Sequence, residues 1–236
     1  ETAGLKAGEP IISTGSPLSV KLGPGIMGNI FDGIERPLNK INDLSEGFIP
    51  EGIGLLSIDE EKLWKTEVLV KEGQFLKAGD VYAQVQETPL IMHKIMVPPD
   101  VEGTVVKVMP SGDYNINTAV VTLETMNGNR DLFLYQEWPV RIPRPVKRRK
   151  SISIPLVTGQ RVLDSFFPLA KGGTVAIPGG FGTGKTMTQH QLAKWSDADV
   201  IVYIGCGERG NEMTEVLEDF PKLIDPKTNL ALMNRT

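Results

Sequence analysis

The sequence has a single cysteine, Cys206, and only two histidines. One cysteine cannot form a disulfide within the chain, so a disulfide-stabilised scaffold is excluded and a reducing compartment is favoured. No run approaches the roughly 18 apolar residues that a membrane-spanning helix needs. Residues 1–6 show neither the apolar core of a signal peptide nor the bias of a transit peptide. We therefore expect any association with a membrane to go through partner proteins.

The chain is long enough, and apolar enough, to bury a sizeable hydrophobic core. The chain has 236 residues and a mass of 25.8 kDa, with 40% hydrophobic and 23% charged residues. This length allows one large domain or two small ones, and this composition argues against general disorder. The 25 glycines and 17 prolines predict short strands separated by many turns.

Charge is distributed unevenly along the chain. Residues 46–125 carry 6 basic and 13 acidic side chains, whereas residues 126–150 carry 7 basic and 2 acidic ones. A basic patch could bind nucleic acid or an acidic neighbour. Because Pro139, Pro143 and Pro145 interleave with the basic residues, we interpret the basic stretch as an extended connector that faces solvent or another protein of an assembly. We expect no nucleic-acid site.

The residue patterns on either side of this connector differ. Residues 1–45 are rich in turns, and they predict β-type structure and a short helix near residues 28–34. Residues 46–125 have no long helical period and predict a small antiparallel β module. Its strand-like runs are residues 68–70, 81–85, 103–108 and 120–123.

Residues 151–236 alternate between two kinds of element. Residues 174–177 and 199–204 are short apolar runs and predict buried strands. Residues 185–195 and 210–220 predict helices, the second with apolar side chains at i, i+3, i+4 and i+7. Strand, helix, strand and helix at these lengths predict an α/β fold with a parallel sheet.

The strongest signal is the segment 179–186, which reads Gly-Gly-Phe-Gly-Thr-Gly-Lys-Thr. It fits the phosphate-loop pattern G-x-x-x-x-G-K-[ST] between a predicted strand and a predicted helix. Glycines let successive backbone N–H groups face one phosphate, and the helix N-terminus favours an anion. Lys185 then reaches the β- and γ-phosphates, and the Thr186 hydroxyl is placed to bind Mg²⁺. The alternative is a plain glycine-rich turn. The predicted nucleotide-binding residues are Gly179, Gly180, Phe181, Gly182, Thr183, Gly184, Lys185 and Thr186.

A second site is predicted at residues 205–210, after the next strand. The carboxyl ends of neighbouring parallel strands share one crevice, so Glu208 is expected on the same edge as Lys185. A carboxylate there can polarise the water that attacks the γ-phosphate, and Arg209 can contact phosphate or a protein interface. The alternative is that Glu208 and Arg209 cap the following helix or pair with each other.

The remaining reactive or aromatic residues near these motifs are interpreted as packing residues. Cys206 is expected to be a small packed residue, and His190 to pack or face solvent on the helix after the loop. His190 and His93 are too isolated in the sequence to suggest a metal site. Phe181 and Trp195 are expected to pack in the core or the loop.

Taken together, the motifs resemble the catalytic alpha (A) subunits of the V-type and A-type rotary ATPases over essentially the whole chain. The stretch 205–213, Gly-Cys-Gly-Glu-Arg-Gly-Asn-Glu-Met, is specific to this family rather than general to phosphate-loop proteins. The module has none of the cysteine-rich character of eukaryotic members, so it resembles prokaryotic ones. The segments that carry the resemblance are residues 22–28, 32–38, 158–164, 178–186, 189–195 and 202–213.

The resemblance implies a fold and a site. It implies a RecA-like core interrupted by a barrel-sandwich-like bulge at residues 46–125, with residues 1–45 ending an N-terminal β-barrel and starting the core. It implies ATP or ADP with Mg²⁺, held by Lys185 and Thr186. It makes Glu208 the residue that activates water and Arg209 a residue of the nucleotide site.

The resemblance also implies partners and a location. It implies an alternating A₃B₃ ring with B subunits, a central stalk, and a membrane sector that moves H⁺ or Na⁺. The chain is then expected at the cytoplasmic face of a membrane, without spanning it. Family members are considerably longer, and the strand with the Mg²⁺-binding Asp, the adenine pocket and the helical domain have no counterpart here. We therefore expect an incomplete chain that is at most weakly active alone.

Three other interpretations of the sequence remain open. Residues 70–81 and 103–113 resemble the half-motifs of biotinyl or lipoyl carrier domains, but Lys94 does not fall at the expected hairpin tip near residues 87–90. A regulatory protein that binds nucleotide without hydrolysis would have no need of Glu208. A helicase-like or terminator-like ring would need a nucleic-acid module, for which the acidic insert is poorly suited.

Overall fold

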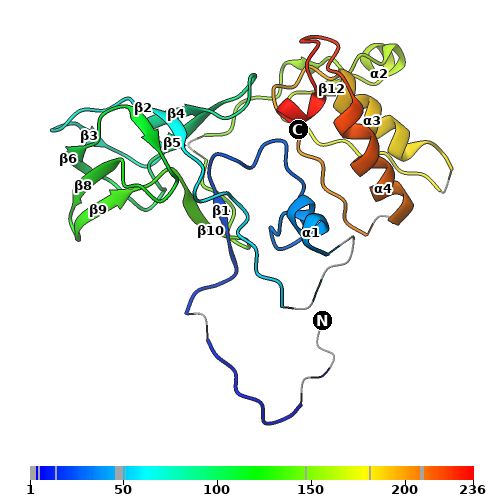
Figure 1. The fold of residues 1–236 in the computed structure, drawn as a ribbon. Coiled ribbons are helices and arrows are strands. Elements are labelled where there is room, and N and C mark those ends of the chain that lie inside the picture. Colours follow the sequence, from blue (N-terminus) through cyan, green and yellow to red (C-terminus); the bar gives the residue numbers. More distant parts are fainter. Residues whose placement is uncertain are drawn as a thin grey trace.

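A computed structural model describes residues 4, 6–13, 15–45, 50, 52–146, 148–180, 182–207 and 210–236. Figure 1 shows a β-rich part that contains strands β2 to β9 and a second part that contains helices α2, α3 and α4. Helix α1 lies between the two in this view, and the first residues of the chain extend away below them (Figure 1). None of the helices in these described ranges has the length and apolar character of a membrane span.

The β-rich part is built from two four-stranded antiparallel sheets. Their strand orders are β5-β4-β2-β7 and β3-β6-β8-β9. The predicted small antiparallel β module is present, but it runs past the predicted end at residue 125, because the strand Gly128–Leu132 pairs in it and Leu132 and Leu134 are buried in its core. The strands are β2 (Trp64–Val68), β3 (Phe75–Leu76), β4 (Val81–Gln86), β5 (Met92–Met96), β6 (Gly103–Val108), β7 (Gly112–Tyr114), β8 (Val121–Thr125) and β9 (Gly128–Leu132).

The two sheets enclose one hydrophobic core. In β8, Val121 and Leu123 are buried while Thr122 is only partly so, as alternation along a half-buried strand requires. The Tyr82 ring is also buried, its hydroxyl donates a hydrogen bond to the Phe133 carbonyl, and burial raises the pKa of this phenol. The core extends from Ile58 to Leu134.

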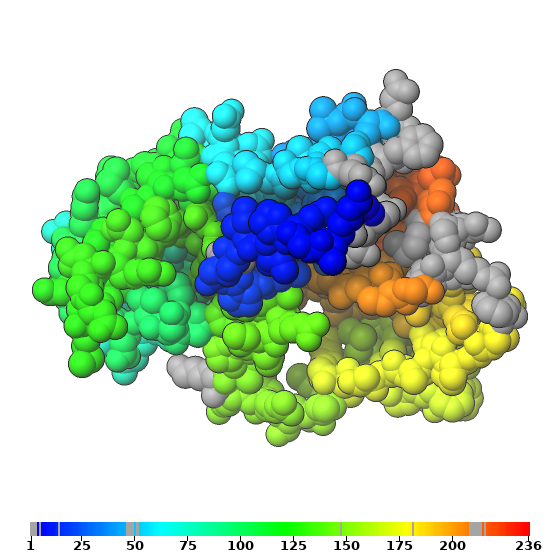
Figure 2. Space-filling view, turned by 90° about the horizontal axis from the view of Figure 1, so that it is seen from below, coloured from blue at the N-terminus to red at the C-terminus, as the bar shows by residue number. Residues whose placement is uncertain are grey.

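The N-terminal segment is tied to the predicted connector. Strand β1 (Ser19–Leu22) pairs antiparallel with β10 (Gln136–Pro139), so part of the connector is regular strand. Figure 2, seen from below, shows the N-terminal segment in blue lying across the molecule between the green module and the orange and yellow C-terminal part.

The predicted short helix near residues 28–34 is wrong. The Asp32 carboxylate accepts backbone hydrogen bonds from Ile34 and Arg36, and it also accepts one from the Arg36 side chain. This local turn replaces helical hydrogen bonds. The helix of this region is α1 (Leu38–Ser45), which begins directly after Pro37.

The C-terminal part holds the predicted helices where the sequence places them. Helix α3 (Lys185–Trp195) spans the predicted 185–195, and α4 (Gly210–Asp219) spans nearly all of 210–220. The other elements of this part are β11 (Pro155–Leu156), α2 (Arg161–Phe166), β12 (Leu169–Ala170), and the 3₁₀ helices η1 (Phe220–Lys222) and η2 (Leu232–Arg235).

The parallel sheet predicted for residues 151–236 is not formed by the described residues. Residues 174–177 and 199–204 lie in no strand, and every ladder between the described strands is antiparallel. Val202 and Ile204 are about three quarters exposed. A parallel strand is buried on both faces and bonded along its edges. The described part of the chain supplies no such surroundings, so these apolar runs join no β-ladder among the described residues.

Three segments far apart in the sequence meet beside η2. The hairpin between β4 and β5 contributes Thr88, whose hydroxyl donates to the Asn234 carbonyl at 2.6 Å. The backbone N–H of Gly28 donates to the Thr236 carbonyl at 2.9 Å. The β module, the N-terminal segment and the C-terminal part are therefore connected through residues 233–236.

Candidate functional site

The predicted phosphate loop is shaped by a contact that only glycine permits. A Cβ atom at Gly179 would lie 2.5 Å from Thr183 Oγ1 and 3.3 Å from Thr183 Cβ. The Thr183 hydroxyl donates to the Gly180 carbonyl at 2.9 Å. The loop thus folds back on itself, and a side chain at Gly179 would force it open. Phe181 lies outside the described residues.

Helix α3 begins directly after this loop with an open N-terminus. Gly182 and Gly184 have φ of +74° and +85°, a backbone conformation that costs glycine little. Gly184 is the N-cap and supplies no side-chain hydrogen bond, and the first turn carries no acidic residue. The first backbone N–H groups of a helix lack partners within the helix, so this end is suited to an anion.

Lys185 and Thr186 occupy the first turn of α3 and are partly exposed. In the described part of the chain, no salt bridge involves Lys185. An ammonium group and a hydroxyl thus stand at the positive end of a helix dipole. Such a set is suited to a phosphate group and to one ligand of a hydrated Mg²⁺ ion.

The second predicted site, residues 205–210, is described except for two residues. Gly205, Cys206 and Gly207 are described, whereas Glu208 and Arg209 lie outside the described residues. Cys206 is exposed, so its interpretation as a packed residue is wrong. It lies between two glycines, which have no side chains to cover it, and Gly207 turns the chain with φ of +68°.

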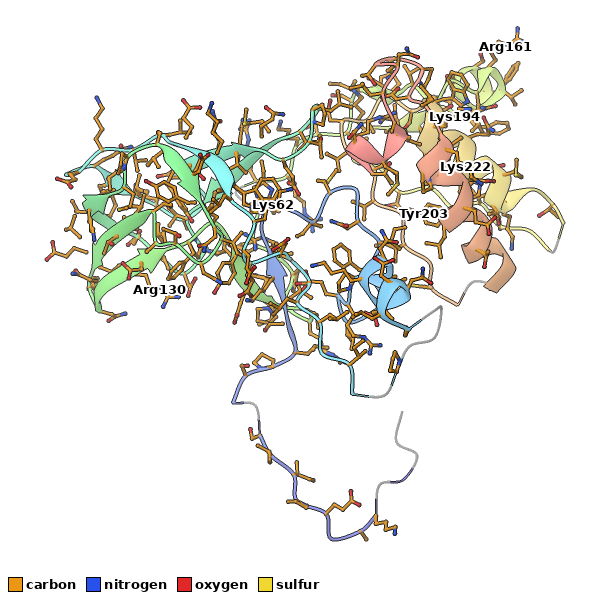
Figure 3. All side chains as sticks on the ribbon, in the orientation of Figure 1. Lys62, Arg130, Arg161, Lys194, Tyr203 and Lys222 are labelled. Atoms are coloured by element: carbon orange, nitrogen blue, oxygen red, sulfur yellow. The ribbon has the colours of Figure 1, made fainter. Side chains whose placement is uncertain are left out.

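His190, on α3, packs in an aromatic cluster with Tyr203 and Phe220. Its ring lies edge-on to Tyr203 at 6.0 Å and to Phe220 at 5.2 Å between ring centroids, and Nε2 is buried without a hydrogen-bond partner. Figure 3 shows Tyr203 on the segment that passes α4. The cluster joins α3 to the segment that leads to Gly205. His190 is therefore a packing residue, as predicted.

Trp195 lies at the other end of α3 and is 39% exposed, so it is not a core residue, but it does pack against the loop at Gly159. Its indole N–H donates to Gln191 Oε1 at 2.8 Å, and a Cβ at Gly159 would lie 2.8 Å from Trp195 Cβ. The Asp164 carboxylate accepts hydrogen bonds from the Thr158 hydroxyl and from the backbone N–H groups of Thr158 and Gly159, and these bonds lower its pKa. The segment before α2 thus holds the end of α3.

Sequence reasoning missed a buried ion pair in this part. Arg235 Nε donates to Asp225 Oδ2 at 2.9 Å, and both side chains are almost fully buried. No sequence pattern pairs these residues; the only signal is the turn-forming Asp-Pro at residue 225. Among the residues that the structure describes, no group of three or more His, Cys, Asp or Glu side chains is arranged to hold a metal ion.

Two family models match the chain. The ATPsynthase alpha/beta subunit barrel-sandwich domain matches residues 55–141, and the nucleotide-binding domain of the ATP synthase alpha/beta family matches residues 159–236. The first covers the two-sheet module and the second covers the loop, α3 and α4. The fold is therefore a barrel-sandwich domain plus part of a nucleotide-binding domain.

Known proteins similar to this chain are ATP synthase subunits. The chain is 72% identical to the V-type ATP synthase alpha chain 2 of Clostridium tetani and 57% identical to the V-type ATP synthase alpha chain of Halothermothrix orenii. It is 53% identical to the corresponding A-type ATP synthase chain of Thermococcus sibiricus. Each match covers 100% of this chain and 40% of the relative, so the chain spans 40% of the length of these proteins.

Proposed function

We propose that this chain, which belongs to the family of V/A-type ATP synthase alpha (A) subunits, is part of a catalytic subunit that interconverts ATP with ADP and phosphate. The observation that carries the proposal is the loop before α3. Gly179 lies against Thr183 where no side chain fits, and the helix after the loop starts without a capping side chain. That arrangement leaves backbone N–H groups available to a phosphate chain.

In this proposal each residue of the site has a role. The loop residues 179–186 hold the phosphates, with Lys185 on the terminal ones, and the Thr186 hydroxyl holds Mg²⁺, which when bound neutralises phosphate charge. Glu208 polarises the water for in-line attack on the γ-phosphate, and Arg209 contributes positive charge to the nucleotide site.

We further propose that residues 174–177 and 199–204 belong to a RecA-like parallel sheet in the complete protein. Residues 174–177 lead into the phosphate loop and residues 199–204 lead into the second site, as strands of such a sheet would. Their exposed apolar side chains support this, since such runs are normally buried on both faces. The Ile201 N–H already donates to the Arg235 carbonyl at 2.7 Å.

The assembly follows from the same family membership. We propose an A₃B₃ ring in which copies of the complete protein alternate with B subunits. The ring acts through a central stalk, and it drives or uses H⁺ or Na⁺ movement in a membrane sector made of other proteins. The chain is then peripheral, at the cytoplasmic face of the membrane. Residues 1–236 alone are proposed to be at most weakly active.

The test is a Glu208→Gln substitution in the full-length protein within its complex. This variant should bind ATP with parental affinity but lose about 10²–10⁴-fold in single-turnover hydrolysis, because the water loses its polarising carboxylate. Glu218→Gln, an exposed site on α4, is the matched control and should hydrolyse normally. Parental turnover by Glu208→Gln would show that the role proposed for Glu208 is wrong.

The carrier alternative is not favoured by the placement of Lys94. This residue lies within β5, paired with Gln84 of β4, whereas the turn between the two strands comprises residues 87–91. A carrier lysine needs a projecting turn to reach a modifying enzyme. Intact mass of the isolated protein should therefore show no biotin or lipoyl group on Lys94, and an added mass there would revive the carrier function.

A further inference from the structure

The last described residues form a closed turn that holds a buried carboxylate. The Asp225 N–H donates to the Leu230 carbonyl and the Asn229 N–H donates to the Asp225 carbonyl, both at 2.8 Å. The carboxylate itself accepts from the Lys227 N–H at 2.9 Å. Leu232, which follows the turn, is fully buried and donates its N–H to the Leu223 carbonyl. The turn is therefore a rigid support for the Asp225 side chain.

Arg235 connects the Asp225 carboxylate to the backbone at Ala198. Its Nε donates to Asp225 Oδ2 at 2.9 Å, and its Nη1 donates to the Ala198 carbonyl at 2.6 Å. The Arg235 and Asp225 side chains are only 5% and 2% exposed, and Arg235 Nη2 is buried without a partner. Burying a charged pair is costly. The planar guanidinium of Arg235 bonds to Asp225 and to the Ala198 carbonyl at once. Such a pair is therefore suited to fixing the position of Ala198 relative to Asp225 more than to adding net stability.

The segment held by Arg235 is the one that leads to the second predicted site. The Arg235 carbonyl accepts from the Ile201 N–H at 2.7 Å, so its side chain and its backbone hold both ends of residues 198–201. From the other direction, the Asp197 N–H donates to the Val157 carbonyl at 2.8 Å. Residues 202–207 follow, with Tyr203 packed on Phe220. The position of this segment thus depends on Arg235.

We propose that Arg235, held by Asp225, is a positioning residue that fixes residues 198–201 and through them residues 202–207, which lead to the second predicted site. This inference rests on the proposed function, because it assigns Arg235 to the same reaction without any contact to nucleotide. Lysine cannot replace it, since a single ammonium group does not span Asp225 and Ala198 with two fixed donors.

The test compares Arg235→Lys with Lys222→Met in the full-length protein within its complex. Lys222 forms an exposed ion pair with Asp219 at 3.9 Å in the same part of the chain, so it is a matched control (Figure 3). Arg235→Lys should lower kcat for ATP hydrolysis by about 10- to 100-fold while nucleotide affinity changes less than about threefold, since misplacing a group costs rate rather than binding. Lys222→Met should change neither.

Hydrogen exchange of the same proteins separates positioning from general damage. The amides of residues 198–207 should exchange faster in Arg235→Lys, while those of β8 in the module should not change. Parental exchange at residues 198–207, or a fall in nucleotide affinity as large as the fall in kcat, would overturn the proposal. If Arg235→Lys does not assemble, Asp225→Asn must show the same changes to a smaller extent, and its failure to do so overturns the proposal equally.

The exchange measurement also distinguishes this proposal from the proposed function. If Glu208→Gln hydrolyses ATP at the parental rate, the role proposed for Glu208 fails. Faster exchange together with a lower kcat in Arg235→Lys would then still support Arg235 as a positioning residue.

Discussion

Glu87 and His93 lie across the turn between β4 and β5, with Glu87 Oε2 2.7 Å from His93 Nδ1. The Glu87 side chain is 2% exposed, and its other oxygen accepts the N–H groups of Gly25 at 2.6 Å and Met27 at 2.9 Å. One carboxylate therefore joins the β module to the N-terminal segment. In the same turn, the Thr88 hydroxyl donates to the carbonyl of Asn234, the residue next to Arg235.

Glu87→Gln should loosen this junction. Burial raises the pKa of Glu87, but hydrogen bonds from His93, Met27 and Gly25 outweigh it and leave the pKa below its ordinary value. Replacing a buried, hydrogen-bonded carboxylate should lower the free energy of unfolding by about 1–3 kcal/mol. Urea denaturation measures this loss. Glu67→Gln, whose carboxylate accepts from Gln84 at an exposed site, is the control and should change it by less than about 0.5 kcal/mol.

The stabilisation by Glu87 should depend on pH. Because the folded-state pKa is lowered, the unfolded chain binds the proton more tightly, and the contribution is present above the unfolded value of about 4.3. It is lost as pH falls through the folded pKa. The difference in unfolding free energy between the parent and Glu87→Gln should thus shrink when urea denaturation is repeated below about pH 4. A difference that grows on acidification would contradict the charged form as the stabilising one.

Gly179→Ala should weaken nucleotide binding more than Gly180→Ala. A Cβ at Gly179 would collide with Thr183 Oγ1 at 2.5 Å, whereas one at Gly180 meets no atom within 4 Å. Relieving the collision moves the loop, and we expect at least a tenfold loss of affinity, or about 1.4 kcal/mol. Titration of the full-length protein with a fluorescent ATP analogue measures both variants. Equal affinities would show that the Gly179 contact does not shape the site.

The sequence predicts the elements whose formation depends on neighbouring residues, namely helix α3 and the strands of the β module. Helix α3 spans the predicted residues because the phosphate-loop motif marks its start at Lys185. The module is predictable because its strands are short apolar runs separated by turn residues. The helix predicted near residues 28–34 does not form because the Asp32 side chain accepts hydrogen bonds from the backbone N–H groups of Ile34 and Arg36, which a pattern of apolar residues does not register.

What the sequence does not predict depends on contacts between distant residues. The apolar run at 199–204 is a strand only if neighbours pair with it, and pairing is not a property of the run. The Asp225–Arg235 pair and the Glu87 junction join residues with no shared motif. Within the candidate site, the motif predicts that residue 179 must be glycine. It does not predict that a side chain there would collide with the Thr183 hydroxyl.

The most direct measurement is the affinity of the full-length protein for ATP when Lys185 is replaced by alanine. Lys194→Ala is the control, because Lys194 lies in the last turn of the same helix with its ammonium 5.3 Å from the Trp195 ring centroid (Figure 3). If residues 179–186 hold the phosphates, Lys185→Ala should weaken binding by about tenfold or more, the worth of a charge-assisted contact to phosphate. Lys194→Ala should bind as the parent does. Unchanged affinity in Lys185→Ala would contradict the nucleotide site on which the proposed function depends.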